Sequence, residues 1–374
     1  MSERHLHIIS FSIPYPPNYG GVIDVFYKLK ALHAQGIKIH LHCYEYDRER
    51  SPELLKYCDS VQYYKRRTGI LSALSFKPYI VSSRRSKELL DNLLNDDYPV
   101  LFEGLHTCYH LGDKRLRDRK KIYRESNIEH HYYYNLYRVE KNLLKKMYFL
   151  LASVKLKWYE RVLRHASLML VVSEKDADYL RKRFRNMVVH FLPSFHANDT
   201  VRCKTGHGDY ALYHGNLSIA ENYNAASYLI KEVFNDSDLR LVIAGMNPPE
   251  HLKAMAAEKK NITLGSNPTD DEMFRLIADA QVNVLVTFQA TGLKLKLLNT
   301  LYNGRFVLVN KAMLNGTGLD DLCVIADDSN AIKKNLNELI MKDFREEQVI
   351  TRSDRLQKNY CNETNARRLI DYIF

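Results

Sequence analysis

The chain has 374 residues, of which 45% are hydrophobic and 26% charged, and its formal net charge at pH 7 is +11. This length exceeds what one hydrophobic core usually serves, and the composition is that of a globular protein, which excludes a disordered or fibrous chain. No run approaches the twenty consecutive apolar residues of a transmembrane helix, and we expect no signal segment. The six cysteines form no Cys-x-x-Cys pair. We therefore expect a cytoplasmic protein without structural zinc.

The positive charge is concentrated between residues 112 and 165, where fifteen lysines and arginines face far fewer acids. Such a region attracts phosphate groups on a substrate, on anionic lipid or on nucleic acid, although a solvated basic face is the plain alternative. No zinc-finger, RRM-like or KH-like signature accompanies it, so we expect no nucleic-acid partner.

The first elements in chain order predict a βαβ unit. Residues 6–11 are rich in β-formers, and the Pro/Gly-rich segment 13–21 follows as a loop. Residues 22–35 carry apolar side chains at helical spacing, Gly36 suits the end of that helix, and residues 37–43 alternate like a strand. This order implies a parallel sheet with a right-handed crossover. Further strands are predicted at residues 98–102, 121–123 and 168–172.

The rest of the chain repeats this alternation after an interruption. A long helix is predicted from about residue 135 to residue 165, and the polar run 196–209 indicates a linker. Strand patterns then return at residues 210–213, 239–244, 262–264, 282–287, 306–309 and 322–325, and residues 366–374 form a final amphipathic helix. We therefore expect two Rossmann-like domains at 1–195 and 210–355, with residues 356–374 packing back on the first domain.

Three glycine-containing loops follow predicted strands, where parallel α/β sheets bind ligands. Gly20 and Gly21 precede the first helix, so free amides there could meet a phosphate, although a turn that needs positive φ is an equal alternative. Residues 213–216 occupy the matching place in the second half. Residues 291–296 open a helix with a glycine and two lysines, which suits a diphosphate, although the lysines could be ordinary surface residues. None of these loops is a Walker A or Gly-x-Gly-x-x-Gly motif.

The order of these motifs resembles that of the retaining, group 1 type of GT-B glycosyltransferases, in the Gly-x-Lys-x-Lys variant. The resemblance covers nearly the whole chain and is carried by residues 15–21, 123–130, 171–174, 214–216, 222, 243–245 and 292–296. It implies a GT-B fold, which consists of two Rossmann-like domains with parallel sheets facing a central cleft and a C-terminal helix that crosses back to the first domain.

The resemblance also implies roles for individual residues. It places donor binding at Gly20, Gly21, Gly215, Asn216, Gly245, Thr291, Gly292, Lys296 and Asn299. It gives the catalytic positions to Glu129, His130 and Lys294, and the acceptor side to Ser126 and Asn127. Two acidic positions of the family fall on Thr291 and Asn299, and a histidine often found near the sugar falls on Ser126. An asparagine amide can still bind a ribose diol, with less strength than a carboxylate.

The function implied is transfer of a sugar from a UDP- or GDP-linked donor to a glycan or lipid-linked acceptor in cell-surface polysaccharide synthesis, with retention and without cofactor or metal. Residues 143–158 mix apolar, basic and aromatic side chains, which is compatible with peripheral contact with an anionic membrane, although a buried core helix with solvated lysines is the more ordinary interpretation. A non-catalytic GT-B scaffold that has lost the family's acids remains open. A sugar-nucleotide epimerase of this architecture and a basic nucleic-acid binder are weaker alternatives.

Overall fold

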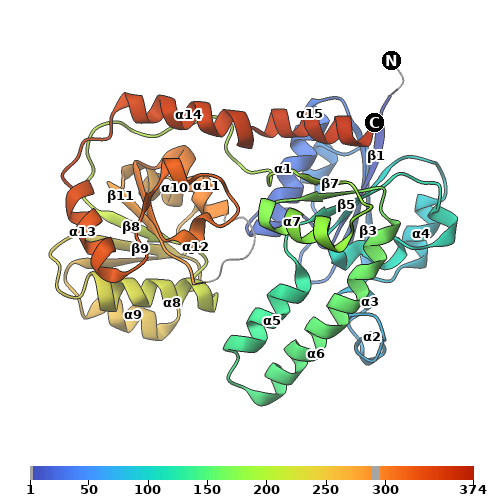
Figure 1. Cartoon of the computed structure of the whole chain (residues 1–374), viewed down its shortest axis with the longest axis horizontal. Coiled ribbons are helices and arrows are strands. Elements are labelled where there is room, and N and C mark those ends of the chain that lie inside the picture. Colours follow the sequence, from blue (N-terminus) through green and yellow to red (C-terminus); the bar gives the residue numbers. More distant parts are fainter. Residues whose placement is uncertain (1–2, 289–294) are drawn as a thin grey trace. The chain divides into compact units, whose positions relative to one another are not determined.

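A parallel β-sheet forms the centre of each of two units in the computed structural model, which describes residues 3–288 and 295–374 (Figure 1). The N-terminal unit comprises residues 1–197 and 360–374, and the C-terminal unit comprises residues 198–359. The chain thus leaves the N-terminal unit, builds the C-terminal unit, and returns to the first one.

The sheet of the N-terminal unit has the strand order β3-β2-β1-β4-β5-β6-β7, and all its pairings are parallel. Alternate residues of a strand point to opposite faces, so Ile9 joins the core on one face and Leu6 and Ile8 join the core on the other. The strands are β1 (His5–Ser10), β2 (Lys38–Glu45), β3 (Ser60–Lys65), β4 (Val100–Glu103), β5 (Lys121–Glu125), β6 (Leu168–Val171) and β7 (Val189–Phe191).

Helices cover both faces of this sheet. The α-helices are α1 (Gly20–Ala34), α2 (Ile70–Ala73), α3 (Tyr79–Ser82), α4 (Lys87–Leu93), α5 (Glu129–Val139), α6 (Leu143–Tyr159), α7 (Glu174–Arg183) and α15 (Asn362–Ile373). Short 3-10 turns are η1 (Pro52–Lys56), η2 (Leu105–His110), η3 (Lys114–Leu116) and η4 (Glu160–His165). The expected return of the C-terminal helix is confirmed, because α15 packs against α1 and buries Ala366, Leu369, Ile370 and Ile373.

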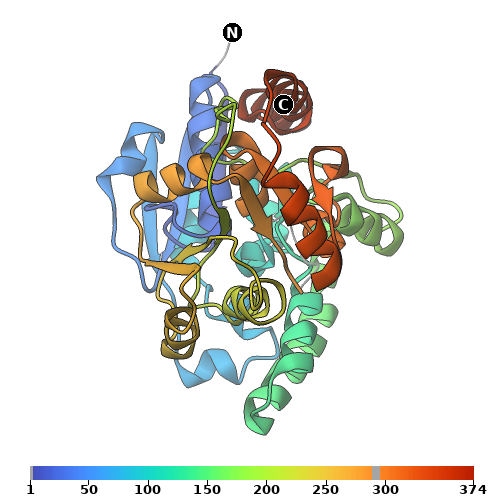
Figure 2. The ribbon, with the colours of Figure 1, turned by 90° about the vertical axis from the view of Figure 1, so that its left-hand side faces the viewer.

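The predicted helix from residue 135 to residue 165 is wrong in its bounds. The structure has a hairpin of α5 and α6, because Asn142 begins a new helix by accepting a hydrogen bond from the Lys145 amide on its side chain (3.1 Å). The two helices pack on one another and extend away from the sheet of the N-terminal unit (Figure 1, Figure 2). The short helices α2, α3 and α4 and strands β3 and β7 were not predicted.

The C-terminal unit has a second parallel sheet, in the order β10-β9-β8-β11-β12-β13. Its strands are β8 (Ala211–His214), β9 (Leu241–Gly245), β10 (Ile262–Ser266), β11 (Val282–Leu285), β12 (Phe306–Val309) and β13 (Val324–Ile325). Its helices are α8 (Ala220–Tyr228), which continues as a π-turn η5 (Leu229–Val233), α9 (Glu250–Ala257), α10 (Asp270–Asp279), α11 (Leu295–Asn303), α12 (Lys311–Leu314), η6 (Asp320–Leu322), α13 (Ser329–Leu339) and α14 (Glu346–Tyr360). Both halves are therefore Rossmann-like, as predicted.

Candidate functional site

Two glycines meet at the carboxyl ends of β8 and β9 in the C-terminal unit. The Gly215 amide donates to the Ala244 carbonyl (3.1 Å), and a Cβ on Gly245 would lie only 1.8 Å from the Gly215 oxygen. Gly245 is thus required by the close approach of two backbones, since neither glycine has a positive φ. The two loops therefore lie close together at the end of the sheet where α/β folds bind ligands, with the side chains of Leu217 and Asn222 beside them.

Lys296 lies in the first turn of α11 and points to the same loops. Its Nζ donates to Asn222 Oδ1 (3.0 Å) and lies 5.1 Å from the centre of the Tyr213 ring. The Asn222 amide in turn donates to the Asn216 carbonyl (2.9 Å). The structure therefore brings Gly215, Asn216, Gly245 and Lys296 together through Asn222.

His214 and Thr287 complete the polar surroundings of these loops. Burial, followed by the charge of Lys296, lowers the pKa of His214 to about 3, so the ring is neutral and pairs with Thr300 Oγ1 (2.8 Å). The Thr287 hydroxyl at the end of β11 donates to Glu221 in the first turn of α8. Glu221, Thr287 and Thr300 were not predicted, because no motif distinguishes them in the sequence.

Asn299 faces along its own helix. Its side-chain oxygen accepts from Asn303 Nδ2 (3.0 Å), and its carbonyl accepts from the same amide (2.7 Å). An incoming ribose would have to replace the first of these bonds. Three other expected positions, Thr291, Gly292 and Lys294, lie outside the described residues.

Gly20 and Gly21 begin α1 in the N-terminal unit. Neither has a positive φ, so the turn alternative is wrong. A Cβ on Gly21 would lie 2.6 Å from the Phe11 ring, so packing against that ring explains the residue. Tyr19, which precedes the helix, places no side-chain cap on its first amides.

Glu129 is the first residue of α5 and is buried. Burial raises the pKa of its carboxyl to about 8, although the positive charge of Arg84 opposes the shift. Its Oε1 lies 3.8 Å from His106 Nδ1, and burial holds the pKa of His106 well below its ordinary value. Glu129 is therefore a neutral carboxylic acid at pH 7, beside a neutral imidazole.

His130 faces a different set of partners. Its Nδ1 lies 3.3 Å from Glu160 Oε1, and its carbonyl accepts from Ser153 Oγ (2.8 Å). Glu160 also accepts from the Tyr179 hydroxyl (2.9 Å) and pairs with Arg183. The structure thus does not bring His130 together with Glu129, since successive helix residues point about 100° apart.

Ser126 and Asn127 lie in the loop between β5 and α5. Ser126 and Asn127 are both partly exposed. The backbone amide of Asn127 donates a hydrogen bond to Glu125 Oε1 (3.2 Å). Glu125 itself is buried, and burial and the nearby Glu129 raise its pKa well above the ordinary value. Ser126 and Asn127 thus lie between two buried carboxyl groups, Glu125 and Glu129, whose pKa values burial raises, and Glu125 was not predicted.

A buried charge network joins α1, β4, β5 and the segment after β7. Lys28 Nζ lies 3.0 Å from Asp24 Oδ2 and 2.6 Å from Glu103 Oε1, and Arg124 lies 3.4 Å from Asp24. The Phe195 amide donates to Asp24 (2.7 Å). Burial alone would raise the pKa of Asp24, but Lys28 and Arg124 lower it to about 2. Two acids and two bases balance one another, so the network has a structural role.

Neither membrane-crossing helices nor metal clusters are found in residues 3–288 and 295–374. No helix of that part is long and apolar enough to cross a bilayer. No group of three or more His, Cys, Asp or Glu side chains there could hold a metal ion.

Known proteins show similarity to the whole chain. No family model matches it. An uncharacterised 44.6 kDa protein from the cps region of Klebsiella pneumoniae is 26% identical over 351 residues, which covers 88% of this chain and 89% of that protein.

Solved structures share the architecture at low identity. Sucrose-phosphate synthase from Thermosynechococcus elongatus has a TM-score of 0.68 at 13% identity, over 99% of this chain and 98% of its own. A mutant of S. aureus TarM, in complex with fondaparinux, α-GlcNAc-glycerol and UDP, has a TM-score of 0.67 at 10% identity, over 100% of both chains. The chain therefore has the GT-B glycosyltransferase fold, and it resembles the retaining enzymes with that fold.

Proposed function

We propose that the protein is a retaining glycosyltransferase that moves a sugar from a UDP- or GDP-linked donor to a glycan or lipid-linked glycan, without a metal ion. The observation that carries the proposal is the convergence of Gly215, Gly245 and Lys296 at the carboxyl ends of β8 and β9. Glycine loops at the ends of parallel strands and one ammonium group suit a diphosphate. The UDP bound to the similar TarM structure supports this choice of ligand.

The chemistry follows from where charge develops. The leaving diphosphate gains negative charge in the transition state, and the Lys296 ammonium would stabilise it. Lys294 and Gly292 are expected to add to this group. Glu129, with a pKa of about 8, would hold a proton at neutral pH and could donate a hydrogen bond to a sugar or acceptor hydroxyl. Gly20 and Gly21, with Ser126 and Asn127, are proposed as further ligand contacts of the N-terminal unit.

Cell-surface polysaccharide synthesis is the proposed setting, supported by the Klebsiella relative that comes from a cps region. The exposed apolar and basic face of α6 supports peripheral contact with an anionic membrane at the cytoplasmic side, where lipid-linked acceptors reside. Sedimentation with anionic vesicles tests that contact.

Calorimetry and turnover test the proposal together. We expect the wild type to bind one UDP- or GDP-sugar, the Lys296→Ala variant to bind it at least tenfold more weakly, and the Lys260→Ala variant, changed at an exposed lysine, to bind it normally. Sugar transfer that is lost in Lys294→Ala would support catalysis.

The scaffold alternative has its own observation, the engagement of Asn299 with Asn303 in place of a free acid. Donor binding without transfer or donor hydrolysis would favour a scaffold that retains the site. If none of the nucleotide sugars binds, both the donor site and the transferase proposal fail.

A further inference from the structure

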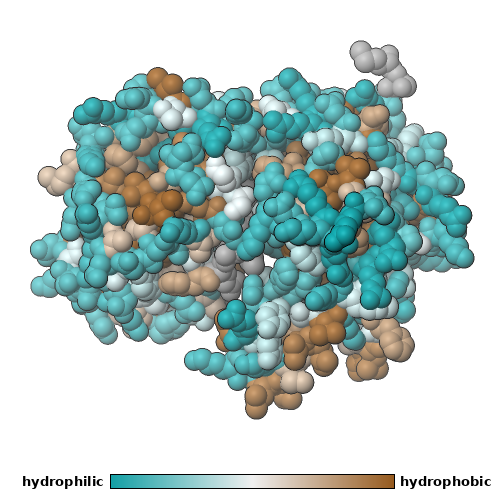
Figure 3. Space-filling view, viewed as in Figure 1, coloured by the Kyte–Doolittle hydropathy of each residue, from teal (hydrophilic) through white to brown (hydrophobic). Residues whose placement is uncertain are grey.

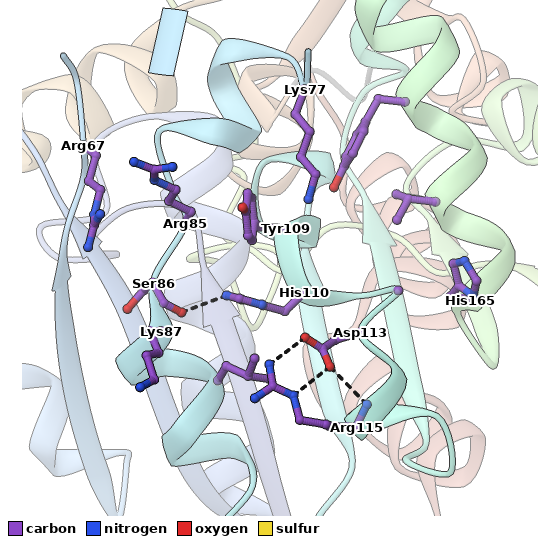
Figure 4. Close-up of a pocket in the computed structure, with 14 residues that line it drawn as sticks. Arg67, Lys77, Arg85, Ser86, Lys87, Tyr109, His110, Asp113, Arg115 and His165 are labelled. Atoms are coloured by element: carbon purple, nitrogen blue, oxygen red, sulfur yellow. Dashed lines mark hydrogen bonds and ion pairs between the residues drawn. The ribbon is translucent and has the colours of Figure 1, made fainter. Parts of the chain in front are cut away.

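A cationic pocket lies in the N-terminal unit, and none of its lining residues belongs to the glycine loops. It has a volume of about 830 Å³ and is lined by Arg67, Lys77, Arg85, Lys87, Arg115 and Asp113, among others (Figure 4). These residues come from the segment after β3, the turns around α2, α3 and α4, and η3. Among the described residues that line it, five lysines and arginines face one carboxylate.

The one carboxylate neutralises one arginine only. Arg115 donates hydrogen bonds to Asp113 from Nε (3.0 Å) and from Nη2 (3.0 Å), and this ion pair lines the pocket (Figure 4). Arg67, Arg85 and Lys87 make no side-chain hydrogen bond or ion pair with any residue of 3–288 or 295–374. Three full positive charges are therefore available to a ligand.

Lys77 adds a fourth charge that is half-buried. Its Nζ lies 3.7 Å from the centre of the Tyr109 ring, and burial lowers the pKa of the amine. In Figure 4 Tyr109 lies between Lys77 and Arg85, so both cations border the same space. A cation that has lost part of its hydration gains more from a bound dianion than a fully exposed one does.

An apolar pocket adjoins the cationic one along the chain. It has a volume of about 530 Å³ and is lined by Ile70, Ala73, Tyr79, Ile80, Leu151 and Val154, among others. Arg67 lines the cationic pocket and Thr68 the apolar one, and the same holds for Lys77 and Pro78. The two linings are therefore adjacent in sequence at two places on one short segment of the chain.

This apolar pocket opens among exposed hydrophobic side chains. Leu71 on α2 is 78% exposed, and Leu151 on α6 is 58% exposed. Figure 3 shows hydrophobic side chains gathered over α6 and α2. A hydrocarbon chain could therefore continue from the pocket onto a surface of the same character.

We infer that the two pockets together bind an anionic amphiphile, with a phosphate or diphosphate head among Arg67, Lys77 and Arg85 and a hydrocarbon chain beside Ile80 and Leu151. The shared chemistry is a lipid phosphate, which either a membrane glycerophospholipid or an isoprenoid carrier supplies. The inferred site lies outside the donor loops, so binding of the amphiphile can be tested whether or not the protein transfers a sugar.

Binding of three probes to the full chain tests this inference. By calorimetry, below the micelle concentration, we expect farnesyl diphosphate to bind at least tenfold more tightly than inorganic diphosphate. The double variant Lys77→Met/Arg85→Gln should lose at least tenfold in affinity for both. The double variant Ile80→Ser/Leu151→Ser should lose affinity for farnesyl diphosphate alone. Vesicles of phosphatidylglycerol in phosphatidylcholine form the third probe and separate the two sources.

The matched control is Lys182→Met/Arg185→Gln, which removes two exposed cations from the same unit. If it weakens diphosphate binding as much as Lys77→Met/Arg85→Gln does, the attraction belongs to the net charge and the inference is overturned. Equal binding of inorganic and farnesyl diphosphate, with no vesicle binding sensitive to Lys77→Met/Arg85→Gln, would also overturn it. Variant-sensitive vesicle binding assigns the head to a membrane phospholipid, and a preference for farnesyl diphosphate without such vesicle binding assigns it to an isoprenoid carrier. Circular dichroism and UDP-sugar binding show whether each variant is folded.

Discussion

At the scale of single residues, Glu129 couples stability to pH. A carboxyl whose pKa rises from 4.5 to about 8 on folding contributes its full stability below pH 4.5 and loses it as the pH rises toward 8. We expect the Glu129→Gln variant to match the wild type near pH 4.5 and to be more stable by up to about 4 kcal/mol at pH 8. Urea unfolding at both pH values measures this difference.

The Glu129→Asp variant is the control for charge, because it keeps a titrating carboxyl at the same buried position. Its stability should still fall between pH 4.5 and 8. If the wild type and the Glu129→Gln variant have the same free energy of unfolding at pH 8, the Glu129 carboxyl has an ordinary pKa in the folded protein and is ionised there. The proposed proton donor would then be lost.

Gly245 gives a second prediction at this scale. A methyl group there would meet the Gly215 oxygen at 1.8 Å, so β8 and β9 must separate or the loop must move. We expect Gly245→Ala to lower the free energy of unfolding by about 1–3 kcal/mol and to weaken donor binding at least tenfold. Gly265→Ala on neighbouring β10 is the control, because its Cβ would lie 3.6 Å from Ala244 Cβ, an ordinary contact. Equal behaviour of the two variants would show that the close approach has no role in binding.

The sequence predicted site residues that belong to a local motif. It did not predict residues whose partners are far away in the sequence. Gly245 and Lys296 were found because a glycine after a strand and a lysine at a helix start have a local signature. The Asp24, Lys28, Glu103 and Arg124 network has none, since its members are up to 100 residues apart in sequence. The different partners of Glu129 and His130 also depend on η2, which carries His106, and on η4, which carries Glu160, and no local pattern specifies their packing.

At the scale of elements, the α5–α6 hairpin shows why periodicity gave one helix instead of two. Apolar residues recur on both sides of the break, and the break itself depends on one side chain, Asn142, which caps α6. Asparagine is a common N-cap residue, so the sequence did contain a sign of the break, but it consisted of this one residue. The hairpin also shows that the alternative of a buried core helix is wrong, because much of α6 is exposed: Leu143 is 77%, Leu144 is 84% and Trp158 is 54% exposed.

The same exposure gives a prediction for α6. An apolar side chain in water makes no packing contribution, but on a bilayer each one buried adds about 1.5–3 kcal/mol. We expect Leu143→Asp/Leu144→Asp to reduce sedimentation with phosphatidylglycerol vesicles at least tenfold while leaving the melting temperature unchanged. Val188→Asp, at another exposed apolar position of the N-terminal unit, is the control. Unchanged vesicle binding in the double variant would remove α6 from the membrane contact.

At the scale of the whole molecule, alternation of strand and helix patterns was enough to predict two parallel-sheet halves. That inference depends only on the order of elements, because a parallel pair needs a crossover connection. The order of strands within each sheet was not predicted, since β1 and β8 become central only through pairings far along the chain. The return of residues 356–374 was expected from the amphipathic pattern near the end of the sequence, and in the structure residues 360–374 belong to the N-terminal unit. The physical reason is that the apolar face of α15 completes the core on the α1 side of the first sheet.

Because the N-terminal unit is built from two separate stretches of chain, its stability should depend on the last residues of the protein. Leu369 is fully buried between α15 and α1, so Leu369→Ala removes three carbons from a packed core. We expect a loss of about 2–5 kcal/mol in the free energy of unfolding. The loss should be confined to the N-terminal unit, with faster hydrogen exchange in α1 and β1 and unchanged exchange in β8 and β9. Leu144→Ala, at an exposed position, should change neither, and faster exchange in both units of Leu369→Ala would show that they unfold as one.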